Sequence, residues 1–142
     1  MCTFHNKITD KEVVKGYKLA VVNNKTGLYS SPATGIPYKV GKVPVAIEYG
    51  NEGLSKKLGY TDILNKQNSC FKSQYAGKTA VFVNLGNAVD MMNYLSDYID
   101  GTGYSFVILK MELSGDLYNG YYQGSDVYIG SKIVSIKKVK EQ

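Results

Sequence analysis

The chain has 142 residues, which fits one domain of ordinary size and is too short for two separate cores. Hydrophobic residues make up 44% of the chain and charged residues 20%, so a largely disordered protein is excluded. The formal net charge is +5, and all 17 basic residues are lysines. Because arginine is the commonest reader of guanine, its absence argues against sequence-specific DNA binding.

The segment 1–15 is polar and has no apolar run of signal-peptide length. It predicts a flexible lead to a single domain spanning residues 16–142. No stretch reaches the ~18 apolar residues that a transmembrane helix needs. The two cysteines, Cys2 and Cys70, form no C-x-x-C pair. We therefore expect free thiols and a cytoplasmic protein that does not contact a membrane.

The first half of the domain predicts three strands. Gly16–Val22 is rich in apolar and β-branched residues, and the turn Asn23–Gly27 connects it to a short strand at Leu28–Ser30. These two segments predict a hairpin. A third strand is expected at Val43–Tyr49, where Pro44 favours an edge or a strand start.

The region 51–77 carries the faintest pattern in the chain. Asn51–Lys57 and Asp62–Lys66 can each form a helical turn, and the polar stretch Gln67–Gln74 is typical of an exposed loop. Long irregular loops in compact domains are often functional.

One helix is predicted in the second half, after a strand at Lys78–Asn84. Its apolar residues recur at three- and four-residue spacing and form a single stripe, made of Leu85, Ala88, Val89, Met92, Leu95 and Ile99. Asn84 or Asn87 can cap its start, and Gly101 follows its end.

Two further strands are predicted after the helix, Tyr104–Leu113 and Lys132–Val139, and the segments Leu117–Tyr122 and Asp126–Ile129 between them flank Gly120 and Gly124. The total is six or seven strands with one main helix, and hairpins outnumber crossovers. This pattern predicts an α+β fold with a mostly antiparallel sheet and the helix packed on it.

The standard catalytic motifs are absent from the sequence. It has no phosphate-binding G-x-x-x-x-G-K-[ST] loop, no H-E-x-x-H and no G-x-S-x-G. The one histidine, His5, lies near the N-terminus, and we expect neither a metal site nor a cofactor. If the protein were an enzyme, Glu112 and Asp126 would be the first candidates for a catalytic acid.

Tyrosine is the most informative residue type, with 13 tyrosines and no tryptophan. Tyr118, Tyr121, Tyr122 and Tyr128 cluster among glycines near the C-terminus. This cluster has two interpretations: a tyrosine-rich hairpin that half covers a core, or a recognition surface for a base or a partner protein. A stacked base contributes roughly 1–3 kcal/mol, so two such platforms can hold a small nucleotide.

The order of features resembles that of small phage- and prophage-encoded proteins of unassigned function. The resemblance spans residues 16–140 and is carried by short segments: Gly16-Tyr17-Lys18, Tyr29-Ser30-Ser31-Pro32, Tyr38–Lys42, the strand and helix Thr79–Ile99, Gly115–Tyr118 and the basic last strand. It implies a role in countering host defence, similar to that of anti-Thoeris sponge proteins.

The chain also shows a distant similarity to the ADP-ribosyltransferase superfamily. Phe82-Val83-Asn84 stands where those domains have an aromatic strand end before a helix. Their arginine or histidine on the first core strand has no counterpart, since His5 precedes the first predicted strand. Ser131 and Lys132 occupy the stretch where an acid is expected. The similarity therefore implies a degenerate active site and binding without turnover.

Three hypotheses follow. The favoured one is a non-enzymatic phage or prophage protein that sequesters a nucleotide-derived, cyclic ADP-ribose-like immune signal in the host cytoplasm or blocks a host defence protein, with a pocket that a homodimer can share. The alternatives are an enzyme acting on NAD and an inhibitor module without a small ligand. The expected ligand-binding residues are Phe82, Asn84, Tyr118, Tyr122, Tyr128 and Lys132.

Overall fold

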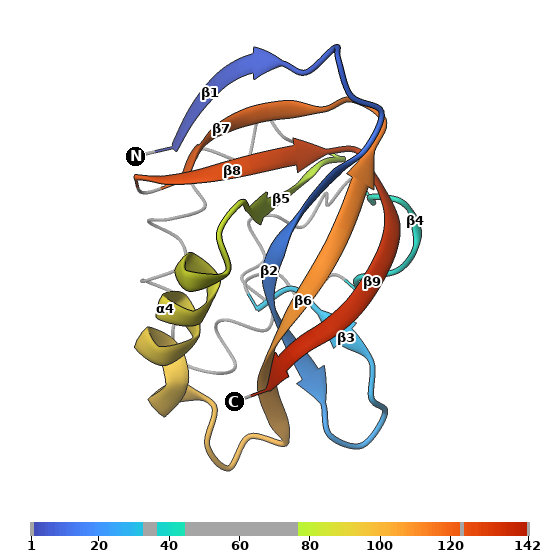
Figure 1. Ribbon diagram of the computed structural model, residues 1–142. Coiled ribbons are helices and arrows are strands. Elements are labelled where there is room, and N and C mark those ends of the chain that lie inside the picture. Colours follow the sequence, from blue (N-terminus) through green and yellow to red (C-terminus); the bar gives the residue numbers. More distant parts are fainter. Residues whose placement is uncertain (1, 33–36, 45–76, 123, 142) are drawn as a thin grey trace.

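The computed structural model describes residues 2–32, 37–44, 77–122 and 124–141. Within them, all the strands form one nine-stranded sheet in which every pairing is antiparallel (Figure 1). The strands are β1 (Cys2–Lys7), β2 (Val14–Asn23), β3 (Tyr29–Ser30), β4 (Gly41–Lys42), β5 (Thr79–Phe82), β6 (Tyr104–Ser114), β7 (Tyr118–Tyr122), β8 (Ser125–Gly130) and β9 (Lys132–Glu141). Their order in the sheet is β1-β7-β8-β5-β2-β6-β9-β4, and β3 pairs with β2.

The predicted α+β class with one main helix is confirmed, and the predicted number of strands was too low. The two strands that the sequence did not indicate are β1 and the two-residue β4. β1 lies inside the segment 1–15, for which we expected a flexible lead. It pairs with β7, more than 110 residues away along the chain, as the pair Cys2 and Tyr122 shows. His5 therefore belongs to the first strand and does not precede it.

The long strands β2 and β6 form the centre of the sheet. They pair without interruption from Val14 opposite Leu113 to Asn23 opposite Tyr104. Since side chains alternate between the two faces of a strand, each of these strands contributes apolar residues to both sides of the sheet. This double burial explains the near-continuous apolar run in β6, where Phe106 to Leu109 are all fully buried.

Two clusters of buried side chains occupy the two faces. The helix α4 (Leu85–Leu95) covers the first, which we call the helix-side cluster; its members include Leu19, Val21, Phe82, Ala88, Met92, Leu95, Phe106 and Ile108. The second, the inner cluster, lies on the opposite face and includes Val14, Ala20, Val43, Val81, Val107, Leu109, Met111, Leu113 and Ile133.

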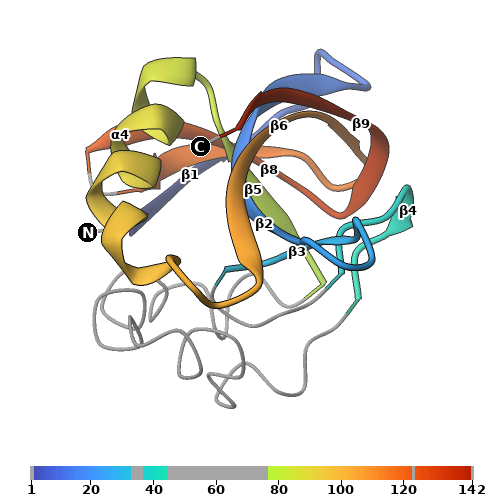
Figure 2. The ribbon, with the colours of Figure 1, turned by 90° about the horizontal axis from the view of Figure 1, so that it is seen from below.

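The inner cluster is enclosed because the sheet curls. The backbone N–H of Tyr38 donates to the carbonyl oxygen of Tyr29 in β3 at 3.0 Å, and β4 pairs with β9 through Gly41 and Ile133. The segment 37–43 therefore connects the β3 side of the sheet to β9. Viewed from below, β2, β6 and β9 curve round toward β3 and β4 (Figure 2). The result is a small barrel-like half of the molecule, next to the half that the helix covers.

The helix begins where the sequence predicts and ends earlier. Asn84 is the N-cap residue with extended backbone angles, although its side chain makes no capping hydrogen bond. The α-helix stops at Leu95, and a 3₁₀ turn, η1 (Ser96–Tyr98), replaces the predicted last turn. The Ser96 hydroxyl donates to the carbonyl oxygen of Asn93 at 2.9 Å, a local bond that competes with helix continuation.

Most of the other predicted elements are confirmed within a residue or two. The hairpin of β2 and β3 is present, and β5, β6 and β9 coincide with the strands expected there. The tyrosine-rich segments around Gly120 and Gly124 form the paired strands β7 and β8. The predicted strand Val43–Tyr49 beyond Pro44, and nearly all of the region 51–77, lie outside the described residues. No helix among the described residues is long and apolar enough to cross a membrane.

Candidate functional site

Two of the six predicted ligand residues flank the start of the helix. Phe82 is a core residue, only 8% exposed, and its β5 position pairs with Val127 in β8 and Tyr17 in β2. Asn84 follows on the exposed surface as the helix N-cap. Burial leaves Phe82 no open ring face for a base to stack on.

The two predicted tyrosines whose side chains are described lie on opposite faces of the sheet. Tyr118 packs against the helix-side cluster and pairs with Ile129, whereas Tyr128, one residue before Ile129, packs against the inner cluster. Each ring has a lysine amine above it at 6.0 Å from the ring centre, Lys78 at Tyr118 and Lys11 at Tyr128. A single small ligand therefore cannot contact both.

The remaining two predicted ligand residues are also separated. The backbone of Tyr122 pairs with Cys2 and Ser125 at the end of β7. Lys132 is exposed at the start of β9, opposite Ser114 in β6 and Lys42 in β4. The six residues thus do not come together as one site.

The two candidate catalytic acids do not lie on neighbouring strands. Glu112 in β6 accepts a hydrogen bond from the Ser135 hydroxyl at 2.8 Å, and Asp126 is exposed in β8. The strands β5 and β2 separate β8 from β6 in the sheet. Among the residues that the structure describes, no group of three or more histidine, cysteine or acidic side chains can hold a metal ion.

A site of different composition lies on the inner face, around Lys18. This residue is in the middle of β2, opposite Leu109, with Gly16 and Ala20 before and after it on the same face. Its side chain is half-buried, and the desolvation of its amine lowers the pKa to about 8. The amine lies 5.8 Å from the ring centre of Tyr38, which packs against the inner cluster.

Lys18 has no carboxylate partner among the described residues, where the one ion pair joins Lys138 and Glu141. An ammonium group surrounded by protein is costly unless an opposite charge or hydrogen bonds compensate for the lost water. The face of an aromatic ring compensates only in part. The environment of Lys18 is therefore one that an anion would improve.

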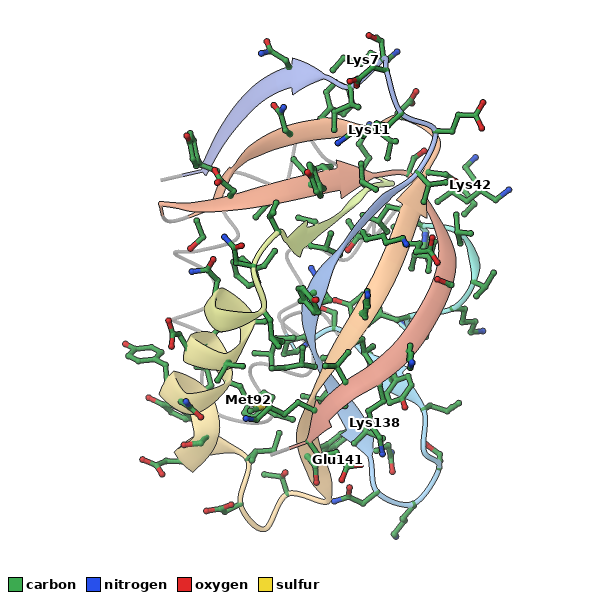
Figure 3. All side chains as sticks on the ribbon, in the orientation of Figure 1. Lys7, Lys11, Lys42, Met92, Lys138 and Glu141 are labelled. Atoms are coloured by element: carbon green, nitrogen blue, oxygen red, sulfur yellow. The ribbon has the colours of Figure 1, made fainter. Side chains whose placement is uncertain are left out.

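A second lysine, Lys138 in β9, lies on the inner face opposite Leu109, the residue that also pairs with Lys18. Lys138 Nζ lies 2.5 Å from Glu141 Oε1, and this hydrogen bond and the carboxylate charge raise its pKa, with a smaller contribution from Tyr29 (Figure 3). Tyr29 packs against the inner cluster, as Tyr38 does. The inner face therefore carries an enclosed lysine, two half-buried tyrosines and an ion pair at its rim.

Sequence reasoning missed Lys18, although the sequence holds a signal for it. Alternate residues of β2 on the inner face are Gly16, Lys18, Ala20 and Val22. A lysine between two small residues has room to lie along the sheet, whereas a lysine on a solvated face needs no such neighbours. The segment 37–43 that encloses it could not be placed from the local pattern.

No protein-family model, curated protein or solved structure matches the chain. The resemblance to phage proteins and to ADP-ribosyltransferases stays a prediction. The function proposed below is supported by the geometry around Lys18.

Proposed function

We propose that the protein is a non-enzymatic binding protein that holds a nucleotide-derived anionic ligand on its inner face. The observation that supports this proposal is the enclosed amine of Lys18, which lies over Tyr38 and has no carboxylate partner among the described residues. A phosphate group would supply the missing opposite charge. Tyr38 and Tyr29 would supply apolar and aromatic contact to the rest of the ligand.

The titration of Lys18 suits this role. At pH 7, one unit below a pKa of about 8, roughly nine-tenths of the amine is still charged. A bound phosphate favours the charged form and raises the pKa again, so ligand binding and protonation reinforce each other. Affinity should consequently fall as the pH rises through the pKa of the free amine.

The finer form of the proposal comes from the sequence resemblance. It is that of a phage or prophage protein that sequesters a cyclic ADP-ribose-like immune signal in the host cytoplasm. Sequestration needs an enclosed charge and aromatic contact, and it needs no catalytic acid. The residues Lys18, Tyr29 and Tyr38 replace the six residues predicted from the sequence as the proposed ligand contacts.

The test is a thermal-shift and calorimetric screen with NAD, ADP-ribose, cyclic ADP-ribose isomers and cyclic oligonucleotides, followed by chromatography of the recovered compound. A ligand at 100 times its dissociation constant adds about 2.7 kcal/mol to stability, a midpoint rise of several degrees. We expect Lys18→Met to abolish this rise. The matched control is Lys78→Met, which removes a lysine at similar distance from a tyrosine ring, on the opposite face.

Three results would overturn the proposal. Equal losses in both lysine variants would show an effect of net charge alone. A compound recovered in cleaved form would favour the enzyme hypothesis. No shift with any compound would favour the inhibitor module, and the search would then turn to a protein partner.

A further inference from the structure

A second feature lies on the other face of the same central strands, beyond the edge of the helix. The strand register places three rows of residues side by side across β2, β6 and β9. The rows are Lys15, Glu112 and Ser135; then Tyr17, Lys110 and Lys137; then Leu19, Ile108 and Lys140. Leu19 and Ile108 belong to the helix-side cluster, so all three rows lie on that face.

A bulge in β9 brings the last lysine onto this face. Lys138 pairs with Leu109 and Lys140 with Ile108, which leaves Val139 as an extra residue in β9. In a regular strand Lys137 and Lys140, three residues apart, would point to opposite faces. The bulge instead places both lysines on the outer face. We call Lys15, Lys110, Lys137 and Lys140 the outer basic face.

The outer basic face is exposed and poorly neutralised. All four lysines are exposed. Lys110 and Lys137 are direct cross-strand partners, and like charges in that arrangement destabilise a sheet. Glu112, the cross-strand partner of Lys15, accepts a hydrogen bond from Ser135, and within the described residues no carboxylate lies within 4.0 Å of any of the four amines. The sheet therefore carries a local excess of positive charge that its own acids do not offset.

The helix leaves this part of the sheet open. α4 packs over β2, β5 and β6, and it lies on the far side of β2 and β6 from β9 in both views (Figures 1 and 2). Tyr17, half-buried at the edge of the helix-side cluster, lies in the same row as Lys110 and Lys137. An aromatic ring beside a row of lysines combines a stacking surface with phosphate neutralisation.

We propose that the outer basic face binds single-stranded nucleic acid without sequence preference. Neighbouring strands lie about 4.8 Å apart, so the lysines follow a path across the sheet that a phosphate backbone can track. Tyr17 offers a ring on which a base can stack, which a duplex with stacked bases cannot use. The absence of arginine removes the usual base-edge contacts and leaves the backbone charge as the recognised feature.

The test is fluorescence anisotropy of the purified full chain with a labelled oligodeoxythymidine of roughly 16 nucleotides. With four phosphate contacts, the affinity should fall about fifty-fold between 50 and 200 mM salt, from the slope of about −0.7 per contact for single strands. The affinity of the double variant Lys110→Gln with Lys137→Gln should fall only about seven-fold over the same range of salt, because two phosphate contacts remain. The control Lys25→Gln with Lys39→Gln removes the same charge from exposed positions outside the outer basic face and should match the wild type.

A third variant separates stacking from charge. Tyr17→Leu should weaken binding while its salt dependence stays that of the wild type. The proposal is overturned if both double variants lose affinity equally, or if the oligonucleotide does not bind at 50 mM salt. Equal binding of polyglutamate would assign the face to an acidic protein, and equal binding of a duplex would remove the role of Tyr17; either result also overturns it. Because the outer basic face does not include Lys18, this proposal stands or falls independently of the proposed ligand site.

Discussion

The two apolar clusters share the same central strands and are enclosed in different ways. On the helix side, α4 supplies a layer of side chains that packs onto β2, β5 and β6, as Met92 shows (Figure 3). On the inner side the sheet curls and the segment 37–43 connects it to β9 by backbone hydrogen bonds. On the inner side, the described residues include a half-buried lysine with a desolvated amine, Lys18, whereas four lysines of the other face are exposed: Lys15, Lys110, Lys137 and Lys140.

This difference affects how well each side of the sheet accommodates a charged side chain. A helix laid on a sheet is stabilised by continuous apolar contact, and a lysine within that contact would be expelled or neutralised. A curled sheet is held by its backbone pairing, so it tolerates a desolvated amine in its interior. The desolvation cost of that amine supports our proposal that the inner face binds an anion, whereas the part of the other face under α4 contributes to stability.

The largest expected effect comes from matched truncations in the two clusters. Leu95 in α4 and Leu109 in β6 are both fully buried. Replacing either by alanine should cost about 2–5 kcal/mol in the free energy of unfolding. We expect Leu109→Ala to cost more, because β6 is fixed by pairing with β2 and β9, whereas the helix can shift to fill its cavity. Denaturant unfolding measures both values, and a larger cost for Leu95→Ala would contradict the comparison.

The next largest expected effect is a pH dependence of the free energy of unfolding that is caused by Lys18. Below pH 8 the amine is protonated in both the folded and the unfolded chain, so the folded state carries the full desolvation cost. Between pH 8 and 10.5 the folded chain loses this proton first, so stability rises with pH over that window. Lys18→Met lacks this dependence and should be more stable than the wild type by about 1–3 kcal/mol at pH 7, a gap that narrows toward pH 10.5.

The measurement is a comparison of unfolding free energies of the wild type and Lys18→Met across this pH range. The difference between the two removes the contribution of the other titrating groups. A gap that stays constant or widens with pH would show that the amine is solvated and would weaken its assignment to a ligand. Lys25→Met, at an exposed turn position, is the control that should show no gap.

Gly16 in β2 lies where β5 packs closely against that strand, and its replacement should have an intermediate effect on the free energy of unfolding. A β-carbon at Gly16 would lie 2.6 Å from the carbonyl oxygen of Phe82 and closer still to Cγ2 of Val81. Gly16→Ala must therefore push β5 away from β2, at a cost of about 1–3 kcal/mol. Thermal unfolding measures the loss. An unchanged midpoint would mean that β5 and β2 are not held this closely.

The sequence predicted the parts of the fold that local patterns specify. The apolar and β-branched residues of β2, the apolar run in β6 and the stripe in α4 are each patterns within a short segment of the chain. The polar segment of β1 gave no such pattern, because its pairing with β7 depends on a distant part of the chain. The stripe extended the predicted helix to Ile99, which is indeed buried, although the Ser96 hydroxyl bond ends the α-helix before it.

The candidate site could not be predicted for a related reason. The tyrosines were predicted as ligand contacts because they cluster in the sequence. Side chains alternate between the faces of a strand, however, and Tyr118 and Tyr128 lie on opposite faces of the sheet. Lys18 was not predicted as a site residue, because the local sequence around a lysine in an apolar strand is the same whether its side chain is exposed to solvent or covered by another segment. Its environment depends on Tyr38, which packs against it from a separate segment of the chain.

The smallest expected effect has the opposite sign and tests the helix side alone. Gly86 lies in the first turn of α4, is exposed, and has no atom within 4 Å of where its β-carbon would be. Alanine at this position should therefore stabilise the protein by about 0.5–1 kcal/mol, because glycine loses more backbone freedom in a helix. Gly16→Ala is the matched contrast: the same substitution, in a strand packed on both sides, should destabilise. If the helix contributes to folding and not to binding, Gly86→Ala should raise the unfolding midpoint without changing the affinity for any ligand of the inner face. A change in affinity that follows the gain in stability would show that the two faces are coupled through β2.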